Sequence, residues 1–319
     1  MLALFIAMPL CSWSADANRA AAAAAAVVEQ GGAAVPHAAE SGLPPYAVKL
    51  GGESGFVTNS MLVTWIVALG LIAFAQLATR NIQQVPSGLQ NFWEFLVEGL
   101  YGFLEGIIGA KLVKKTFWFF ATIFIFILFT NWFGLLPGVG TIGWGEHATG
   151  SLLGLSTFDH ISRPLLRGGN ADLNMTFAMA AVFMVLWLVW CLRVNGVGGF
   201  LLHIFGPKGD NVGFIKYMMI VVFFVVGFLE VISIAFRPVS LSFRLYGNVF
   251  AGENLLEAIS NTVQHPAWAK YVFSALLPVP FYFLELLIGV VQAFVFMLLT
   301  TVFTALMCEH EEEPGKAHH

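Results

Sequence analysis

Residues 218–260 read MMIVVFFVVGFLEVISIAFRPVSLSFRLYGNVFAGENLLEAIS, and this stretch decides the fold. It is largely apolar, yet it contains the charged side chains of Glu230, Arg237, Arg244 and Glu253. At about 1.5 Å of rise per residue, a helix of this length reaches roughly 55–65 Å. The hydrocarbon core of a bilayer is only about 30 Å thick. The stretch therefore predicts a membrane helix that is steeply tilted or broken.

Other apolar stretches have the length of membrane spans. A helix needs about 20 mostly apolar residues to cross the bilayer. With the long stretch included, we expect five membrane helices, at about 60–79, 116–136, 172–192, 214–260 and 268–308. The expected fold class is therefore an all-α polytopic membrane protein whose last two helices are long and steeply tilted.

The composition supports a membrane protein and excludes several other classes. Of the 319 residues, 58% are hydrophobic and only 11% are charged, which neither a soluble enzyme nor a disordered chain tolerates. The net charge of −4 gives no sign of nucleic-acid binding. Cys11, Cys191 and Cys308 lie far apart without a CxxC pair, so neither a disulfide framework nor a zinc site is indicated.

An additional helix is expected between the first two spans, at 87–113. Apolar side chains recur there at helical spacing, while Glu94, Glu98 and Glu105 mark another face. This pattern is typical of an amphipathic helix that lies in the membrane interface. Because a basic face is missing, packing against the helix bundle is an equal alternative.

The two ends of the chain differ in composition from the membrane domain, which we expect at 59–310. Residues 1–17 fit a signal peptide that lacks a basic start, and both a cleaved and a retained form agree with the sequence. Residues 18–58 are rich in Ala, Gly and Pro and are expected to form a flexible arm. Residues 309–319 form an acidic tail, which we expect on the cytoplasmic side.

The distribution of basic residues predicts how the chain crosses the membrane. The segments after the first and third spans contain Arg80, Lys111, Lys114, Lys115, Arg193, Lys208 and Lys216. The segments on the other side contain Arg19, Lys49, Arg163, Arg167 and Lys270. Since cytoplasmic loops carry the excess of Lys and Arg, this modest bias predicts an N-terminus outside and a C-terminus inside.

Ionisable side chains within membrane helices are costly and mark functional sites by default. Glu230, Arg237 and Arg244 follow one another at intervals of seven residues and share one helix face, which Asn248 continues one turn further. In the last helix Glu285 and Gln292 are also seven residues apart and share a face. The candidate site comprises Glu230, Arg244, Asn248, Glu253, Glu285 and Gln292.

The predicted orientation divides the carboxylates into two groups. Glu230 lies toward the cytoplasm, whereas Glu253 and Glu285 lie toward the exterior, with Arg244 between them along the chain. A carboxyl group in a poorly solvated groove can exchange protons near neutral pH. Arginine does not lose its proton in proteins. The pattern therefore indicates two half-paths for an ion, separated by a fixed positive charge.

Several of the polar residues also have a structural interpretation. Arg237 either snorkels toward the interface or pairs with Glu230. Asp172 stands where a helix should begin and is better explained as a capping residue. Asn131 and Gln292 are of the type that forms hydrogen bonds between membrane helices.

The motifs resemble those of a known family. PVSLSFRLYGNVFAGENLL at 238–256, followed by LELLIGVVQAFVFMLLTTVF at 284–303, resembles subunit a of rotary F-type ATP synthases. NWFGLLPG at 131–138 and ADLNMT at 171–176 resemble earlier helices of that family. The pattern RLxGNxxAGE with a downstream QAFxF is far more specific than a short glycine motif.

The resemblance implies a stator channel subunit that contacts a rotating c-ring with two long tilted helices. Arg244 matches the family's essential arginine, which separates two half-channels, and Gln292 and Asn248 belong to its neighbourhood. Glu253 matches the acid of the outer path, and Glu285 stands where members carry an acid or a histidine. The inner path is assigned to Glu230 in the same way.

The resemblance also implies partners and a location. The expected partners are the c-ring, the peripheral-stalk b subunits, the rest of the ATP synthase and membrane lipid, with no nucleic acid. The transported ion is a proton, with sodium as the alternative. Because a GxxxxGK[ST] motif is missing, we expect no cofactor, no metal and no catalytic site of its own. A bacterial inner membrane is expected, with an organellar energy-transducing membrane as the alternative.

Two other functions are kept as alternatives. A secondary transporter would use Arg244 as an anion clamp, but it should show internal repeats and paired discontinuous helices. A structural membrane scaffold would tolerate the loss of Arg244, whereas a channel would not. An intramembrane enzyme is disfavoured, since the spans contain no HExxH or GxSxG motif.

Overall fold

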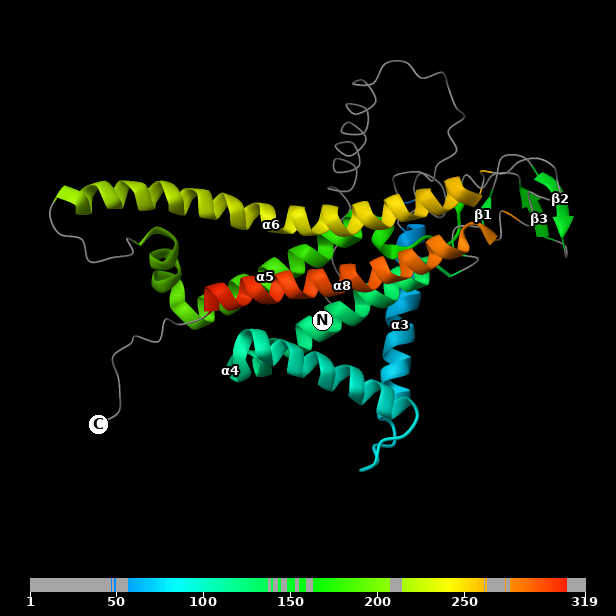
Figure 1. The fold of residues 1–319 in the computed structure, drawn as a ribbon, viewed down its shortest axis with the longest axis horizontal. Coiled ribbons are helices and arrows are strands. Elements are labelled where there is room, and N and C mark those ends of the chain that lie inside the picture. The colour runs from blue at the N-terminus through cyan, green and yellow to red at the C-terminus, as the bar shows by residue number, and fades with distance from the viewer. Residues whose placement is uncertain are drawn as a thin grey trace, which may run out of the picture. The chain divides into compact units, whose positions relative to one another are not determined.

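The computed structural model describes residues 47, 49, 57–136, 139, 143–144, 148–152, 155–158, 163–206, 214–260, 262, 273 and 276–308. The signal peptide expected at 1–17, the acidic tail at 309–319 and nearly all of the arm at 18–58 lie outside these residues. The described chain consists mainly of long helices, which Figure 1 colours from blue to red in chain order.

The part of the chain that the structure describes contains five long helices. They are α3 (Asn59–Thr79), α4 (Leu89–Gly134), α5 (Leu173–Phe205), α6 (Phe214–Ser260) and α8 (Val279–Cys308). Each is long and apolar enough to cross a membrane. The prediction of an all-α protein with five membrane helices is confirmed.

The chain divides into two compact units. Unit 1 comprises the described residues up to Ile66 together with Thr130–Met175 and Tyr246–Gly289. Unit 2 comprises Val67–Phe129, Thr176–Leu245 and the described residues from Val290 onward. Each unit combines segments that are far apart in the sequence, so its side-chain contacts depend on the tertiary fold.

The predicted amphipathic helix and the second predicted span are joined in one element, α4, which is interrupted at Gly109. Gly109 has φ 73° and ψ 160°, a backbone conformation that is open to glycine and strained for other residues. Before this break Leu104 and Ile108 are buried, and Phe103 packs against Phe294 with ring centroids 5.0 Å apart. The first part of α4 therefore packs within unit 2, as the bundle-packing alternative predicts.

Helix α5 is longer than the sequence predicts. The first helical segment continues a few residues past the predicted residue 192 to a break at Gly196, where φ is 69°, and a second helical segment follows to Phe205. The side-chain amide of Asn195 donates a hydrogen bond to the main-chain oxygen of Met307 at 2.6 Å. The glycines of this segment interrupt the apolar pattern, which explains why the sequence indicates an earlier end.

The two last helices match the predicted long stretches to different degrees. Helix α6 has the predicted bounds and includes Pro238, whose carbonyl oxygen accepts a hydrogen bond from the Ser242 hydroxyl at 2.6 Å. Helix α8 begins at Val279, later than the expected residue 268, and 268–272 lie outside the described residues. Pro280 follows the first helical residue, where a proline costs little because that N–H has no helical partner.

The described residues between α4 and α5 include four short strands, and none of them was predicted. Strand β1 (Gly143–Trp144) pairs with β4 (Arg163–Pro164), and β2 (Ala148–Leu152) pairs with β3 (Leu155–Phe158), both antiparallel. The second pair contains a register irregularity between Ala148 and Gly150. Strands of two to five residues leave too little alternation for the sequence to indicate them.

The core of unit 2 is built from aromatic side chains. Phe119 and Phe120 of α4 are fully buried, and Phe119 stacks on Phe183 of α5 with ring centroids 6.2 Å apart. Trp190 contacts both phenylalanines, each at 5.8 Å between centroids. Aromatic pairs of this kind add to the stabilisation that burial of their area already provides.

Candidate functional site

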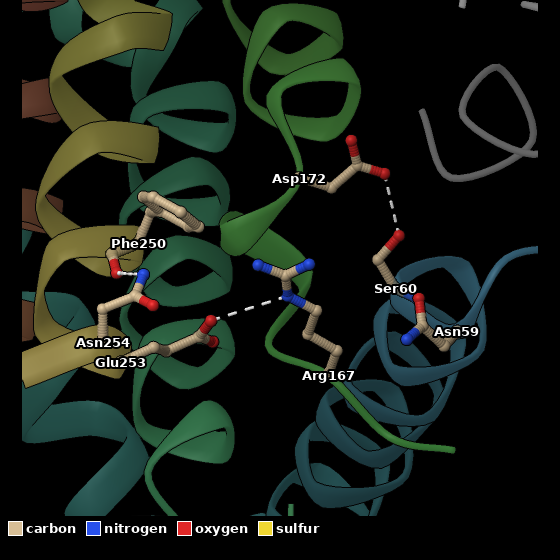
Figure 2. A network of polar contacts seen from close by, with 7 residues as sticks. All are labelled: Asn59, Ser60, Arg167, Asp172, Phe250, Glu253 and Asn254. Carbon is tan, nitrogen blue, oxygen red and sulfur yellow. Dashed lines mark hydrogen bonds and ion pairs between the residues drawn. The ribbon is translucent and has the colours of Figure 1, made fainter. Parts of the chain in front are cut away.

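An ion pair between Arg167 and Glu253 lies in unit 1. Arg167 Nε is 3.5 Å from Glu253 Oε2, and Figure 2 shows the arginine side chain directed toward the carboxylate of α6. The Arg167 side chain is only 2% exposed and that of Glu253 is 15% exposed. Because a buried charge is costly without a partner of opposite charge, each of these side chains stabilises the ionised form of the other.

Two glycines allow the segment after Arg167 to approach its neighbours closely. A Cβ at Gly168 would lie 3.0 Å from Glu253 Oε1, and one at Gly169 would lie 2.8 Å from Thr64 Oγ1. At Gly169 a Cβ would also meet Thr130 at 2.9 Å. These distances exclude an alanine without displacement of a neighbour. The short helix η1 (Gly169–Ala171) follows directly, and all of its residues are buried.

Asp172 connects the start of α5 to α3. Its Oδ1 accepts a hydrogen bond from the backbone N–H of Asn174 at 3.0 Å, which is the interaction of a helix-capping side chain. Its Oδ2 accepts a hydrogen bond from the hydroxyl of Ser60 at 2.8 Å, as Figure 2 shows. The capping interpretation of Asp172 is confirmed, and the contact with Ser60 adds a link that the sequence did not indicate.

Glu285 of α8 is buried against α6 in unit 1. Its side chain is 7% exposed, and its carboxylate fills the space in which a Cβ at Gly252 would lie. Gly252 directly precedes Glu253, and the two carboxylates interact electrostatically. The two acids that the sequence assigned to one side of the membrane thus belong to one unit, and Glu285 of α8 lies against the residue next to Glu253 of α6.

Asn131 fixes the end of α4 to α8. Its side-chain amide donates a hydrogen bond to the main-chain oxygen of Gly289 at 3.2 Å, and its Oδ1 accepts one from Asn170 at 2.7 Å. The indole N–H of Trp132 donates to the main-chain oxygen of Leu286 at 3.3 Å. The predicted role of Asn131 in bonding between helices is confirmed, and these bonds hold the turn of α8 that follows Glu285.

The other predicted site residues do not belong to this polar cluster. In unit 2 Arg244 is exposed, while Glu230 and Gln292 are half-buried. Asn248 belongs to unit 1 and is also exposed. Large apolar side chains are also exposed on α6 between residues 218 and 243, namely Met218, Val222, Phe224, Val225, Val226, Phe228, Leu229, Val231, Ile232, Phe236 and Phe243.

Arg237 lies between aromatic rings of unit 2. Its guanidinium carbon is 4.3 Å from the ring centroid of Phe303 and 5.8 Å from that of Trp187. The indole N–H of Trp187 donates a hydrogen bond to the main-chain oxygen of Phe303 at 3.1 Å, which holds the two rings together. Glu230 also acts electrostatically on Arg237, and the cation–π contacts are an environment that the sequence did not indicate.

Arg167 is the functional candidate that the sequence did not reveal. From the sequence it is only one of several basic residues between the second and third spans. The available signal was weak: an arginine followed by two glycines and, shortly afterwards, by a helix-capping aspartate. In the described part of the chain, no three side chains of His, Cys, Asp or Glu gather as a metal site would require.

Comparisons with known proteins identify similar chains. The family model described as ATP synthase A chain matches residues 61–305. ATP synthase subunit a of Gloeobacter violaceus is 31% identical over 80% of this chain and 85% of its own length. That of Desulforamulus reducens is 32% identical over 80% and 81%, and that of Moorella thermoacetica 30% over 78% and 90%.

Proposed function

This chain belongs to the ATP synthase A chain family, and on this premise we propose that its charged side chains form two half-channels for protons to and from the c-ring. The family supplies the proton-channel stator subunit of the F-type ATP synthase, a multi-pass membrane protein that assembles with the other ATP synthase subunits. The observation that carries the proposal is that the buried Glu285 of α8 lies against Gly252, the residue directly before Glu253, in unit 1.

The outer half-channel uses Glu253 and Glu285. Both carboxylates are mostly removed from solvent, and they come from α6 and α8, so a proton can pass between two acids held by different helices. Poorly solvated carboxyl groups are suited to proton exchange, because their charged form is less favoured than in water. A proton that enters from the outer side is handed over from this pair to a carboxylate of the c-ring.

Arg244 separates the outer from the inner half-channel. It is exposed on α6 among large apolar side chains such as Phe236 and Phe243, a surface suited to contact with an apolar partner helix. A guanidinium stays charged, so it attracts a deprotonated ring carboxylate and cannot itself pass a proton on. Asn248 and Gln292 contribute polar groups to its neighbourhood.

Glu230 serves the inner half-channel. It is half-buried on α6 and interacts with Arg237, whose position is fixed by two aromatic rings. A ring site that arrives there after nearly a full rotation releases its proton to the inner side. Moving one charge across the membrane supplies about 2.3 kcal/mol per 100 mV, so several protons are combined for each ATP.

The partners and the location follow from this function. We assign the c-ring as the rotating partner and the peripheral-stalk b subunits as the static one, with the proton as the transported ion. The relatives come from bacteria, which supports an inner membrane. The excess of Lys and Arg after the first and third spans supports an N-terminus outside and a C-terminus in the cytoplasm.

ATP-driven proton pumping in inverted membrane vesicles tests the proposal. Arg244→Ala is compared with wild type and with Arg80→Ala, an exposed arginine of the turn after α3. Assembly is checked by co-purification of the ring. We expect Arg244→Ala to lose pumping with the complex intact and Arg80→Ala to pump normally. Normal pumping by Arg244→Ala would favour a structural scaffold instead.

A further inference from the structure

We propose that Arg167 is a positioning residue for Glu253 and sets the pH range in which the outer half-channel takes up protons. The inference rests on the proposed function, because it assumes that Glu253 carries protons. It assigns a role to a side chain outside the two long helices, from the segment that precedes η1. The evidence is the geometry of the ion pair and the burial of both partners.

The ion pair has the properties of a built site. Arg167 is 2% exposed, its Nε faces Glu253 Oε2 at 3.5 Å, and the opposite carboxylate oxygen lies beside Gly168. Both oxygens of Glu253 therefore lie close to the same short segment, and Oε2 faces the guanidinium. Since an arginine cannot give up its proton, it presents a permanent positive charge to a group that must repeatedly gain and lose one.

The backbone around Arg167 is fixed independently of Glu253. Asn170 is bonded to Asn131 of α4, and Asp172 is bonded to Ser60 of α3. Gly168 lies beside Gly134, whose Cα would be 3.5 Å from a Cβ at position 168. The segment is thus attached to two other helices, and Figure 2 shows the Asp172–Ser60 bond beside the Arg167–Glu253 ion pair.

The other ionisable groups around Glu253 cannot replace Arg167. Those that interact electrostatically with Glu253 or with its neighbour Tyr246 are Arg167, Asp172, Glu257 and Glu285. Of these, Glu257 and Glu285 act on Glu253 itself and favour its protonated form, whereas Asp172 acts on Tyr246. Arg167 is the basic group among those that act on Glu253, and it opposes these two carboxyl groups. The removal of Arg167 therefore favours the protonated form of Glu253 over its ionised form.

The experiment uses the whole ATP synthase reconstituted in liposomes whose interior corresponds to the outer side of the membrane. ATP synthesis is measured against interior pH at constant exterior pH, while a potassium diffusion potential keeps the total driving force constant. We expect Arg167→Gln to move the profile to higher interior pH by about one unit, because an opposite charge at this distance favours the ionised carboxylate. Arg167→Lys should stay closer to wild type, and Arg80→Gln should match it.

A lower rate with an unchanged profile would overturn the proposal and leave Arg167 a structural residue. Arg167→Met is the second neutral variant, since it fills a buried position without needing a hydrogen-bond partner. If neither neutral variant assembles, Arg167 serves assembly and the proposal is wrong. Glu253→Gln tests the premise separately, with the rate expressed per assembled complex: an unchanged rate in that variant contradicts the proposed function, whereas a lost rate together with unshifted Arg167 variants contradicts only this inference.

Discussion

Gly252 of α6 lies directly against the carboxylate of Glu285 in α8, which occupies the space that a Cβ at position 252 would need. This contact joins the two long helices at the residue before Glu253. A side chain at position 252 would have to displace this carboxylate, although the helical backbone of α6 itself accepts any side chain there. A larger residue at position 252 is therefore expected to disturb Glu285, an acid of the proposed outer half-channel.

Gly252→Ala should displace the Glu285 carboxylate and impair proton transport. Forcing an extra carbon into a filled space typically costs about 1–3 kcal/mol of stability. We expect a clear decrease in ATP-driven pumping in inverted vesicles and a lower thermal midpoint of the purified complex. Gly70→Ala on α3 is the matched control, because a Cβ there meets nothing within 4 Å. Equal pumping by both variants would refute the prediction.

Glu253→Gln should reduce assembly as well as transport. It leaves the Arg167 guanidinium buried without this opposing charge, and breaking a buried ion pair on one side costs about 3–5 kcal/mol. The double variant Arg167→Gln/Glu253→Gln removes both charges and should recover much of the assembly while pumping stays absent. The yield of the complex by co-purification measures the first effect. Additive losses of assembly would show that the two side chains do not act as a pair.

Asn131→Leu should weaken the attachment of α4 to α8. The variant loses the hydrogen bond to Gly289 and the one from Asn170, so buried polar groups are left unsatisfied at about 1–3 kcal/mol each. We expect a lower thermal midpoint and a smaller decrease in pumping than for Glu253→Gln. Asn81→Leu, in the exposed turn after α3, serves as control and should match wild type. An Asn131→Leu protein as stable as this control would contradict the prediction.

Arg237 should contribute to stability more than to transport. Arg237→Lys keeps a cation over the rings of Phe303 and Trp187 and should pump at nearly the wild-type rate. Arg237→Gln loses the cation–π contacts and should lower stability by about 0.5–2 kcal/mol. Thermal unfolding of the complex and pumping in vesicles are measured on the same samples. If Arg237→Lys abolished pumping with the complex intact, Arg237 would belong to the inner path itself.

The sequence predicted the helices well wherever the apolar runs were long. Helix α6 ends as predicted because apolar length and embedded charges are local properties. In α5 the sequence did not indicate the helical segment that follows the break at Gly196, since glycines interrupt the apolar pattern there. The sequence predicted two separate helices at 87–113 and 116–136, whereas the structure has one element, α4, that is interrupted at Gly109. A single glycine with positive φ changes the direction of the chain there without a loop.

What the sequence by itself determined is a membrane protein of five apolar helices with a few charged residues whose cost inside a bilayer marks them as functional. What only the tertiary structure decided is which of these charges meet. Arg167 and Glu253 belong to segments far apart in the chain, and the sequence does not show that both are buried. Whether a charge is buried, and which group neutralises it, depends on the helices that exclude water around it, and those contacts exist only once the chain has folded.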